Sequence, residues 1–137
     1  MKKIRFIISL LTIIIICSSC LAEGKGQKIT VQKRVGGDEN YVDFNEVTDE
    51  KKVRKAMEIV ENADWKDVEV EMPRYFDYQF QFPFKSSSED KIASYLLWVN
   101  ANDQKLEIVT DSKKYVELTK KNSEILYEIL TGEELIK

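Results

Sequence analysis

The chain has 137 residues, of which 33% are charged, and its formal net charge is −3 at pH 7. It contains no histidine, which excludes Ser-His-Asp and Cys-His catalysis in their usual forms and disfavours zinc or copper sites. The excess of acids gives no electrostatic reason to expect nucleic-acid binding, which depends on clustered lysine and arginine.

The N-terminal segment has the layout of a signal peptide for a lipoprotein. Lys2, Lys3 and Arg5 form a basic start, residues 6–16 form an almost unbroken apolar run, and two serines lead to Cys20. A basic region, an apolar region and small residues before a cleavage point define a signal peptide. A cysteine directly after the small residues is what a lipoprotein signal requires, because its thiol takes the lipid before a peptidase cuts in front of it.

Two cysteines compete for the lipid. Cys17 follows Ile16, a β-branched residue that fits badly where the peptidase needs a small side chain, whereas Cys20 follows two serines. We therefore expect residues 1–19 to be the signal and Cys20 to be the lipid-bearing first residue, with palmitate among its lipids. Two alternatives stay open. One is an uncleaved anchor, because residues 6–22 are about long enough to cross a bilayer. The other is plain secretion.

The mature chain is expected to form a single domain. Removing 19 residues from 137 leaves 118, enough for one hydrophobic core. The removed segment carries three positive charges and no acid, so the net charge changes from −3 to −6. Cys20 is then the only cysteine, so no internal disulfide is expected. Residues 20–27 are predicted to be a flexible tether, and residues 28–137 the domain.

The first half of the domain is predicted to contain a strand and a helix. Apolar and polar residues alternate over residues 28–35, which predicts a half-buried strand in which Lys33 is the one polar residue on the apolar side. Residues 41–44 are expected to add at most a short extended piece. Thr48 is expected to cap a helix that ends at residues 62–64. The apolar stripe of this helix consists of Val53, Ala56, Met57 and Val60.

Alternating patterns predict a series of strands in the second half. Residues 68–72 alternate up to Pro73, which predicts an edge strand or a bend, since proline cannot donate to a ladder. Every second residue over residues 76–84 is aromatic, which predicts a strand with an aromatic core face. Three further strands with short turns form a predicted antiparallel meander, at residues 92–101, 105–110 and 114–118.

A second helix is expected to close the domain. Thr119 or Asn122 is expected to cap it, and Gly132 is a good stop. Its apolar stripe consists of Ile125, Ile129 and Leu130, widened by Leu126. We therefore expect an α+β domain in which two helices pack on one face of an antiparallel sheet of about five strands.

Most of the mature sequence resembles a known family. The residues that carry the resemblance are 72–80, the strand around Trp98, 114–118 and 123–130. With this layout, the chain resembles the YhfM-like family of small bacterial lipoproteins of Gram-positive type. It differs at Phe76, where the family pattern tends to have proline. The resemblance implies the fold and the lipid anchor, and it implies no activity, cofactor or catalytic residue.

One cluster of side chains is the best candidate for recognition. Arg74, Tyr75, Asp77 and Tyr78 precede or begin the aromatic strand, and together with Trp98 they form the candidate recognition patch. In the alternative interpretation, an Arg–Asp pair and a rim of tyrosines fix the strand against a neighbour. Trp98 is expected to lie under a helix or, failing that, to mark an exposed contact surface.

No catalytic or metal site is predicted. The many acids lie in no recognisable motif, so most of them are expected to be solvated surface rather than an acid–base pair. The spacing of an EF-hand is missing, and residues 37–40 are more simply a turn. No cofactor is expected.

Three classes of function fit these observations. We expect a non-enzymatic binding module, held by lipid on the extracytoplasmic face of the cell membrane, whose partner is a protein, a peptide or an envelope polymer. A toxin-immunity or inhibitor-type lipoprotein is the second class. An acid-dependent envelope enzyme is the third.

Overall fold

The computed structural model describes residues 28–85, 90–110 and 113–135. The predicted signal, Cys20 and the tether lie outside these described residues. Within the described residues, no helix combines the length and the apolar character needed to cross a membrane.

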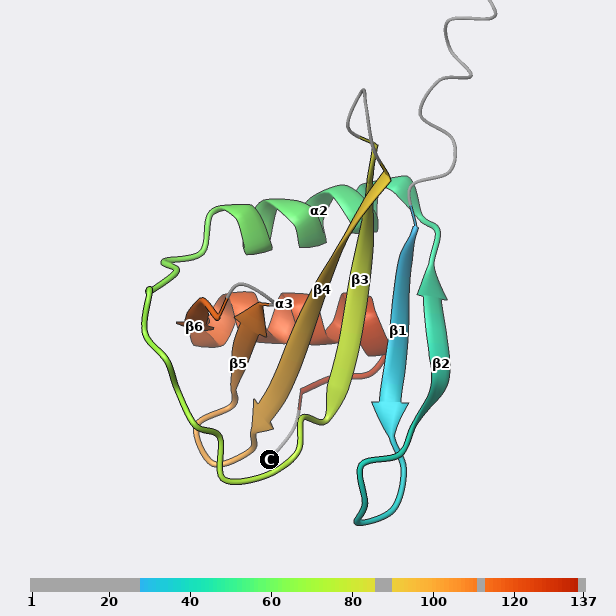
Figure 1. Ribbon diagram of the computed structural model, residues 1–137. Coiled ribbons are helices and arrows are strands. Elements are labelled where there is room, and N and C mark those ends of the chain that lie inside the picture. The colour runs from blue at the N-terminus through green and yellow to red at the C-terminus, as the bar shows by residue number, and fades with distance from the viewer. Residues whose placement is uncertain (1–27, 86–89, 111–112, 136–137) are drawn as a thin grey trace, which may run out of the picture.

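The described residues form one six-stranded antiparallel sheet, and both described helices cover the same face of it (Figure 1). The strand order is β2-β1-β3-β4-β5-β6. The predicted α+β class, with helices on one face, is confirmed. The extended piece expected near residue 41 is a full strand, which accounts for six strands rather than about five. The elements are β1 Ile29–Arg34, β2 Tyr41–Val47, α2 Glu50–Glu61, β3 Tyr78–Lys85, β4 Asp90–Asn100, β5 Lys105–Thr110, β6 Tyr115–Glu117 and α3 Lys120–Thr131.

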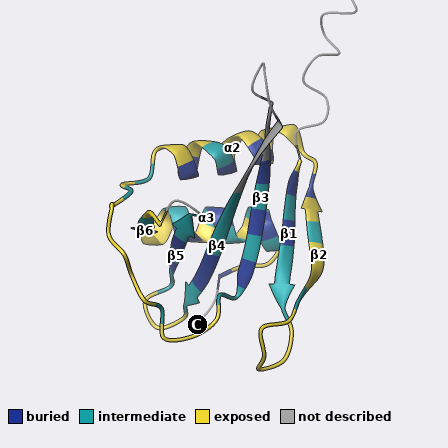
Figure 2. Ribbon diagram, in the orientation of Figure 1, coloured by how far each residue is buried: buried dark blue, intermediate teal, exposed yellow. Residues whose placement is uncertain are grey.

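The hydrophobic core lies between the sheet and the two helices, whose buried sides face the strands (Figure 2). Phe80 is completely buried, and its ring stacks on Tyr95 at a centroid distance of 5.0 Å. The predicted aromatic core face is confirmed for Tyr78, Phe80 and Phe82. It is wrong for Phe76, which precedes β3 and packs against Tyr41 and Trp98 outside the core between sheet and helices.

Side-chain caps fix both helices. Asp49, rather than Thr48, caps α2, because its carboxylate accepts hydrogen bonds from two backbone N–H groups of the first turn at 3.0 and 3.2 Å. A carboxylate at this position also complements the helix dipole, which a threonine hydroxyl cannot do. Thr119 caps α3, and Gly132 ends that helix in the left-handed conformation, with φ of 74°.

Of the two alternatives predicted for residues 68–72, the edge strand is absent from the structure, and the chain bends at Pro73 and Arg74 instead. Val68 and Val70 are 46% and 39% exposed, and an isolated bridge between Lys66 and Tyr115 lies just before the segment. The segment belongs to a long connection that passes around the β6 edge and below the ends of β5 and β4 to reach β3 (Figure 1). No strand pairs with residues 68–72 along this path, so their alternating sequence forms no ladder.

Trp98 lies beneath this connection, on the face of the sheet that the helices leave open. Since Leu97 points into the helix-side core, the alternation of β4 directs Trp98 to the other face. The indole is only 6% exposed, and its Nε1 donates a hydrogen bond to the carbonyl oxygen of Arg74 at 2.9 Å. The expectation that Trp98 lies under a helix is therefore wrong, because the connection covers it instead.

Candidate functional site

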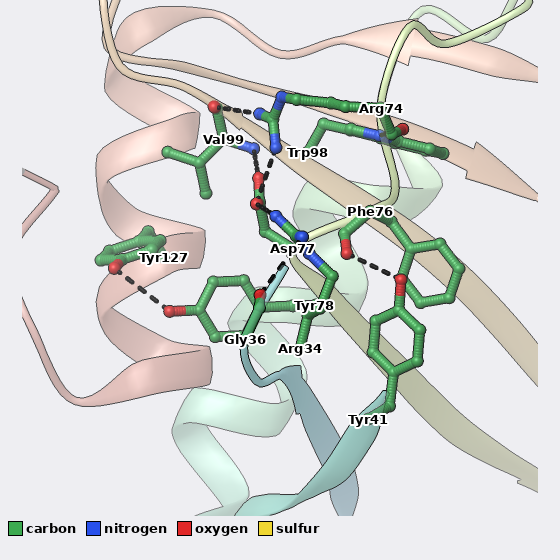
Figure 3. Close-up of polar contacts among 10 residues, drawn as sticks. All are labelled: Arg34, Gly36, Tyr41, Arg74, Phe76, Asp77, Tyr78, Trp98, Val99 and Tyr127. Atoms are coloured by element: carbon green, nitrogen blue, oxygen red, sulfur yellow. Dashed lines mark hydrogen bonds and ion pairs between the residues drawn. The ribbon is translucent and has the colours of Figure 1, made fainter. Parts of the chain in front are cut away.

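Arg34, Arg74 and Asp77 meet where β1 ends and β3 begins (Figure 3). Arg34 is the last residue of β1, and its backbone N–H donates to the carbonyl oxygen of Asp77 at 3.0 Å. β1 and β3 are antiparallel neighbours whose ladder reaches Lys33 and Tyr78. The bond between Arg34 and Asp77 adds one further step to this ladder. Arg74 lies three residues before Asp77 in the same turn and reaches the same carboxylate.

The carboxylate of Asp77 is held by several groups at once. Its Oδ1 accepts a hydrogen bond from Arg74 Nη1 at 2.7 Å and lies 3.6 Å from Arg34 Nη2. Its Oδ2 accepts from the backbone N–H of Val99 at 2.7 Å. Arg74 Nη2 donates to the Val99 carbonyl at 2.8 Å, and the bond to Asp77 raises the pKa of Arg74. Arg74 and Asp77 thus clamp the connection onto the end of β4.

The connection is also held on its other side. The hydroxyl of Tyr41 in β2 donates to the carbonyl oxygen of Phe76 at 2.9 Å, and the two rings stack with centroids 4.1 Å apart. The ring of Phe76 in turn meets Trp98 edge-on at 5.9 Å. Burial raises the pKa of Tyr41 above its ordinary value. Contacts to β2 and β4 therefore fix the position of the Arg74–Asp77 pair.

Arg34 differs from Arg74 in its surroundings. Its side chain is only 21% exposed, and its Nε is buried without a hydrogen-bond acceptor among the described residues. Its Nη1 reaches the carbonyl oxygen of Gly36 at 3.5 Å, a long hydrogen bond. Buried donors in proteins are nearly always paired, so an unpaired guanidinium N–H calls for a physical explanation.

The three residues border a cleft of about 320 Å³, which we call the arginine cleft. Lys33 also lines it, with Nζ 5.1 Å from the ring centroid of Phe44 and 6.0 Å from that of Tyr78, within the range of cation–π attraction. The hydroxyls of Tyr78 and Tyr127 lie 3.4 Å apart at its edge. Burial likewise raises the pKa of Tyr78. The lining residues are Lys33, Arg34, Arg74, Asp77, Tyr78, Val99, Ala101 and Tyr127.

The arginine cleft has the chemistry of an anion-binding site. Its described lining carries three cations and one carboxylate, in a chain whose net charge is −3. Guanidinium groups bind carboxylates and phosphates in fixed geometry, and partial burial strengthens such bonds. Both oxygens of Asp77 already accept hydrogen bonds, so this carboxylate is engaged within the protein. No group of acids or cysteines among the described residues is arranged to hold a metal ion.

The structure brings together part of the predicted recognition patch. Arg74, Asp77 and Tyr78 all line the arginine cleft. Tyr75 is 48% exposed and lies outside the cleft lining, and Trp98 supports the connection from below. Lys33 and Arg34 of β1, and Tyr127 of α3, complete the cleft although the sequence analysis did not include them in the patch.

Comparisons with known proteins bear on the family and the fold. A family model described as YhfM protein matches residues 22–135. A solved structure, that of a thioesterase-like protein from Clostridium sporogenes ATCC 15579, superposes with a TM-score of 0.54. The two sequences are 20% identical, and the match covers 76% of this chain and 94% of the other, so it shows a shared fold. No curated protein matches the sequence.

Proposed function

The chain belongs to the YhfM protein family, and from this premise we propose that it is a lipid-anchored binding protein on the extracytoplasmic face of the cell membrane. The basic, apolar and small-residue order of residues 2–20 supports the anchor. The family match begins at residue 22, so it covers the part of the chain that processing at Cys20 would leave.

The arginine cleft is the proposed binding site, and its ligand is an acidic group on a protein, a peptide or an envelope polymer. The observation that carries this proposal is the excess of positive charge in the described lining of the cleft, which has three cations and one carboxylate. A bound carboxylate or phosphate would accept hydrogen bonds from the guanidinium groups and balance the charge. The likeness to a thioesterase-like protein concerns the fold and adds no activity to the proposal.

Replacing Arg34 by glutamine should weaken the binding of an anionic probe. Hydrogen bonds to charged groups contribute about 1.5–3 kcal/mol, so the dissociation constant of a tetraglutamate peptide or of pyrophosphate should rise about tenfold or more. Isothermal titration calorimetry on the full-length protein measures this, at low and at physiological salt. Binding should be weaker at the higher ionic strength.

Arg54→Gln is the matched control, since it removes the same charge from an exposed arginine of α2 that pairs with Glu50 at 3.6 Å. This variant should bind within about twofold of the wild-type protein, because exposed pairs contribute little. Equal weakening by both substitutions would mean that net charge, and not the cleft, attracts the probe. Melting curves of both variants establish that each is folded.

The lipid anchor is tested by Cys20→Ala. This substitution removes the thiol that takes the lipid, so the unprocessed precursor should accumulate and no lipidated form should appear. Mass spectrometry of the membrane fraction reads out the N-terminal residue and its modification. Cys17→Ala is the control and should be processed normally. A wild-type protein that retains Met1, or that starts after a residue other than Ser19, would rule out the proposed anchor.

A further inference from the structure

β2 contains one residue more than the β1 segment with which it pairs. Val31 pairs with Asn45, and the next residue of β1, Gln32, pairs with Asp43, so Phe44 is left without a partner. This is a β-bulge, which bends the bulged strand and increases its local twist. The bulge lies in the middle of β2, at one edge of the sheet.

The bulge leaves a gap in the row of side chains on the open face of the sheet. The ring of Phe44 packs at 5.9 Å from the core ring of Tyr78, and Asn45 Nδ2 donates to a carbonyl of α3 at 2.9 Å. Two successive residues of β2 are therefore turned toward the helices. The β2 side chains nearest to the gap on the open face are those of Asp43 and Glu46.

A groove of about 550 Å³ occupies this position, and we call it the bulge groove. The register aligns Thr30 with Gln81 and Gln32 with Gln79, so polar side chains from β1 and β3 lie in two adjacent rows. The polar side chains that line the groove are Thr30, Gln32, Asp43, Glu46, Gln79 and Gln81. Since Phe44 and Asn45 also line it while their side chains face the helices, the backbone of the bulge contributes to its wall.

The lining is suited to a neutral ligand rich in hydroxyl groups. Each glutamine carboxamide offers both a donor and an acceptor, and so does a sugar hydroxyl. The two acids are already engaged, because Gln32 Nε2 donates to Asp43 at 3.2 Å and Lys28 pairs with Glu46 at 3.1 Å. These carboxylates would repel an anion. The bulge groove and the arginine cleft therefore favour ligands of different charge.

An extended peptide fits the groove less well. Peptides bind to sheets by adding a strand to an exposed edge, where backbone groups are unpaired. The floor of the bulge groove is formed by β1 and β3, and β1 lies between β2 and β3 with ladders on both sides. Recognition here therefore relies on side chains, which favours a ligand that presents hydroxyls rather than a backbone.

We propose that the bulge groove binds an oligosaccharide, at a site separate from the arginine cleft. Its volume lies within the range of about 300–1,000 Å³ that is usual for small-molecule sites. Neighbouring hydroxyls of two or three sugar rings would bond the carboxamides of Gln32, Gln79 and Gln81. The strands hold these carboxamides on a rigid surface, and Gln79 is further oriented by its bond to Ser94 Oγ at 2.7 Å.

Saturation-transfer NMR on the full-length protein in detergent micelles tests this proposal, with triacetylchitotriose, cellotriose and triglycine as probes. At least one trisaccharide should bind, and triglycine should not. Gln32→Ala and Gln81→Ala should each raise the dissociation constant of the trisaccharide about three- to tenfold, because each removes one or two hydrogen bonds.

Asn62→Ala is the matched control, because it removes an exposed carboxamide at the end of α2, an element that contributes no residue to the lining of the groove. It should leave the dissociation constant unchanged. Absence of binding by both trisaccharides would overturn the proposal. So would equal weakening by Asn62→Ala, or binding of triglycine that is lost in Gln81→Ala. Melting curves verify that Gln32→Ala, which also loses its bond to Asp43, remains folded.

Discussion

Replacing Phe80 by alanine is expected to lower the free energy of unfolding by roughly 3–5 kcal/mol. The side chain is completely buried, stacks on Tyr95 at 5.0 Å and meets Phe82 edge-on at 5.6 Å. Its removal takes apolar surface out of the core and leaves a cavity that these rings cannot fill. A domain of this size has only about 5–15 kcal/mol of stability in total, so the single substitution can unfold it.

Urea titration followed by circular dichroism measures this loss, with Gln81→Ala as the control on the opposite face of β3. Gln81→Ala should cost within about 0.5 kcal/mol, because its side chain lies in an open groove. Gln79→Ala should cost up to about 1 kcal/mol through its lost bond to Ser94. Equal losses for Phe80 and Gln81 would contradict the register of β3, since a shift of one residue exchanges the two faces.

Asp77→Ala is expected to lower the free energy of unfolding by about 2–4 kcal/mol. The substitution removes the acceptor for Arg74 Nη1 and for the N–H of Val99, each at 2.7 Å. It also leaves the partly buried guanidinium of Arg34 without its counter-charge. The connection between α2 and β3 would then lose its clamp on β4.

Glu69→Ala is the control for this second effect. Glu69 pairs with Lys113 at 3.0 Å, but both side chains are about three-quarters exposed, so its loss should cost within about 0.5 kcal/mol. Thermal and urea unfolding of both variants measure the contrast. Raising the salt concentration should abolish any effect of Glu69→Ala and leave most of the effect of Asp77→Ala. Similar losses in the two variants would mean that the Asp77 cluster is no stronger than a surface ion pair.

Local patterns were sufficient to predict most of the fold. The two helices and the C-terminal meander carry strong periodicity and clear turn residues, and the structure has them near the expected positions. The pattern at residues 68–72 left an edge strand and a bend open, because alternation shows only that a segment is extended. Whether it becomes a strand depends on a neighbour, and the path of this segment along the sheet edge offers only the bridge at Lys66.

The candidate site was only partly predictable for a related reason. Arg74 and Asp77 are three residues apart, so their pairing could be proposed from one segment. Arg34 lies far from them in the sequence, and only the pairing of β1 with β3 brings it to Asp77. One signal did exist: Lys33 interrupts the apolar side of β1, and in the structure this residue faces the aromatic rings at the arginine cleft.

Both edges of the sheet are poor templates for the strand of another molecule. At one edge, the extra residue Phe44 divides the seven residues of β2 into two short runs. At the other, β6 has three residues, and Tyr115 already exchanges backbone hydrogen bonds with Lys66 at 2.8 and 3.0 Å. Neither edge offers a long, regular row of backbone donors and acceptors, so edge-to-edge aggregation is disfavoured. A protein crowded in two dimensions by the proposed lipid anchor would rely on this protection against strand-to-strand association at high surface density.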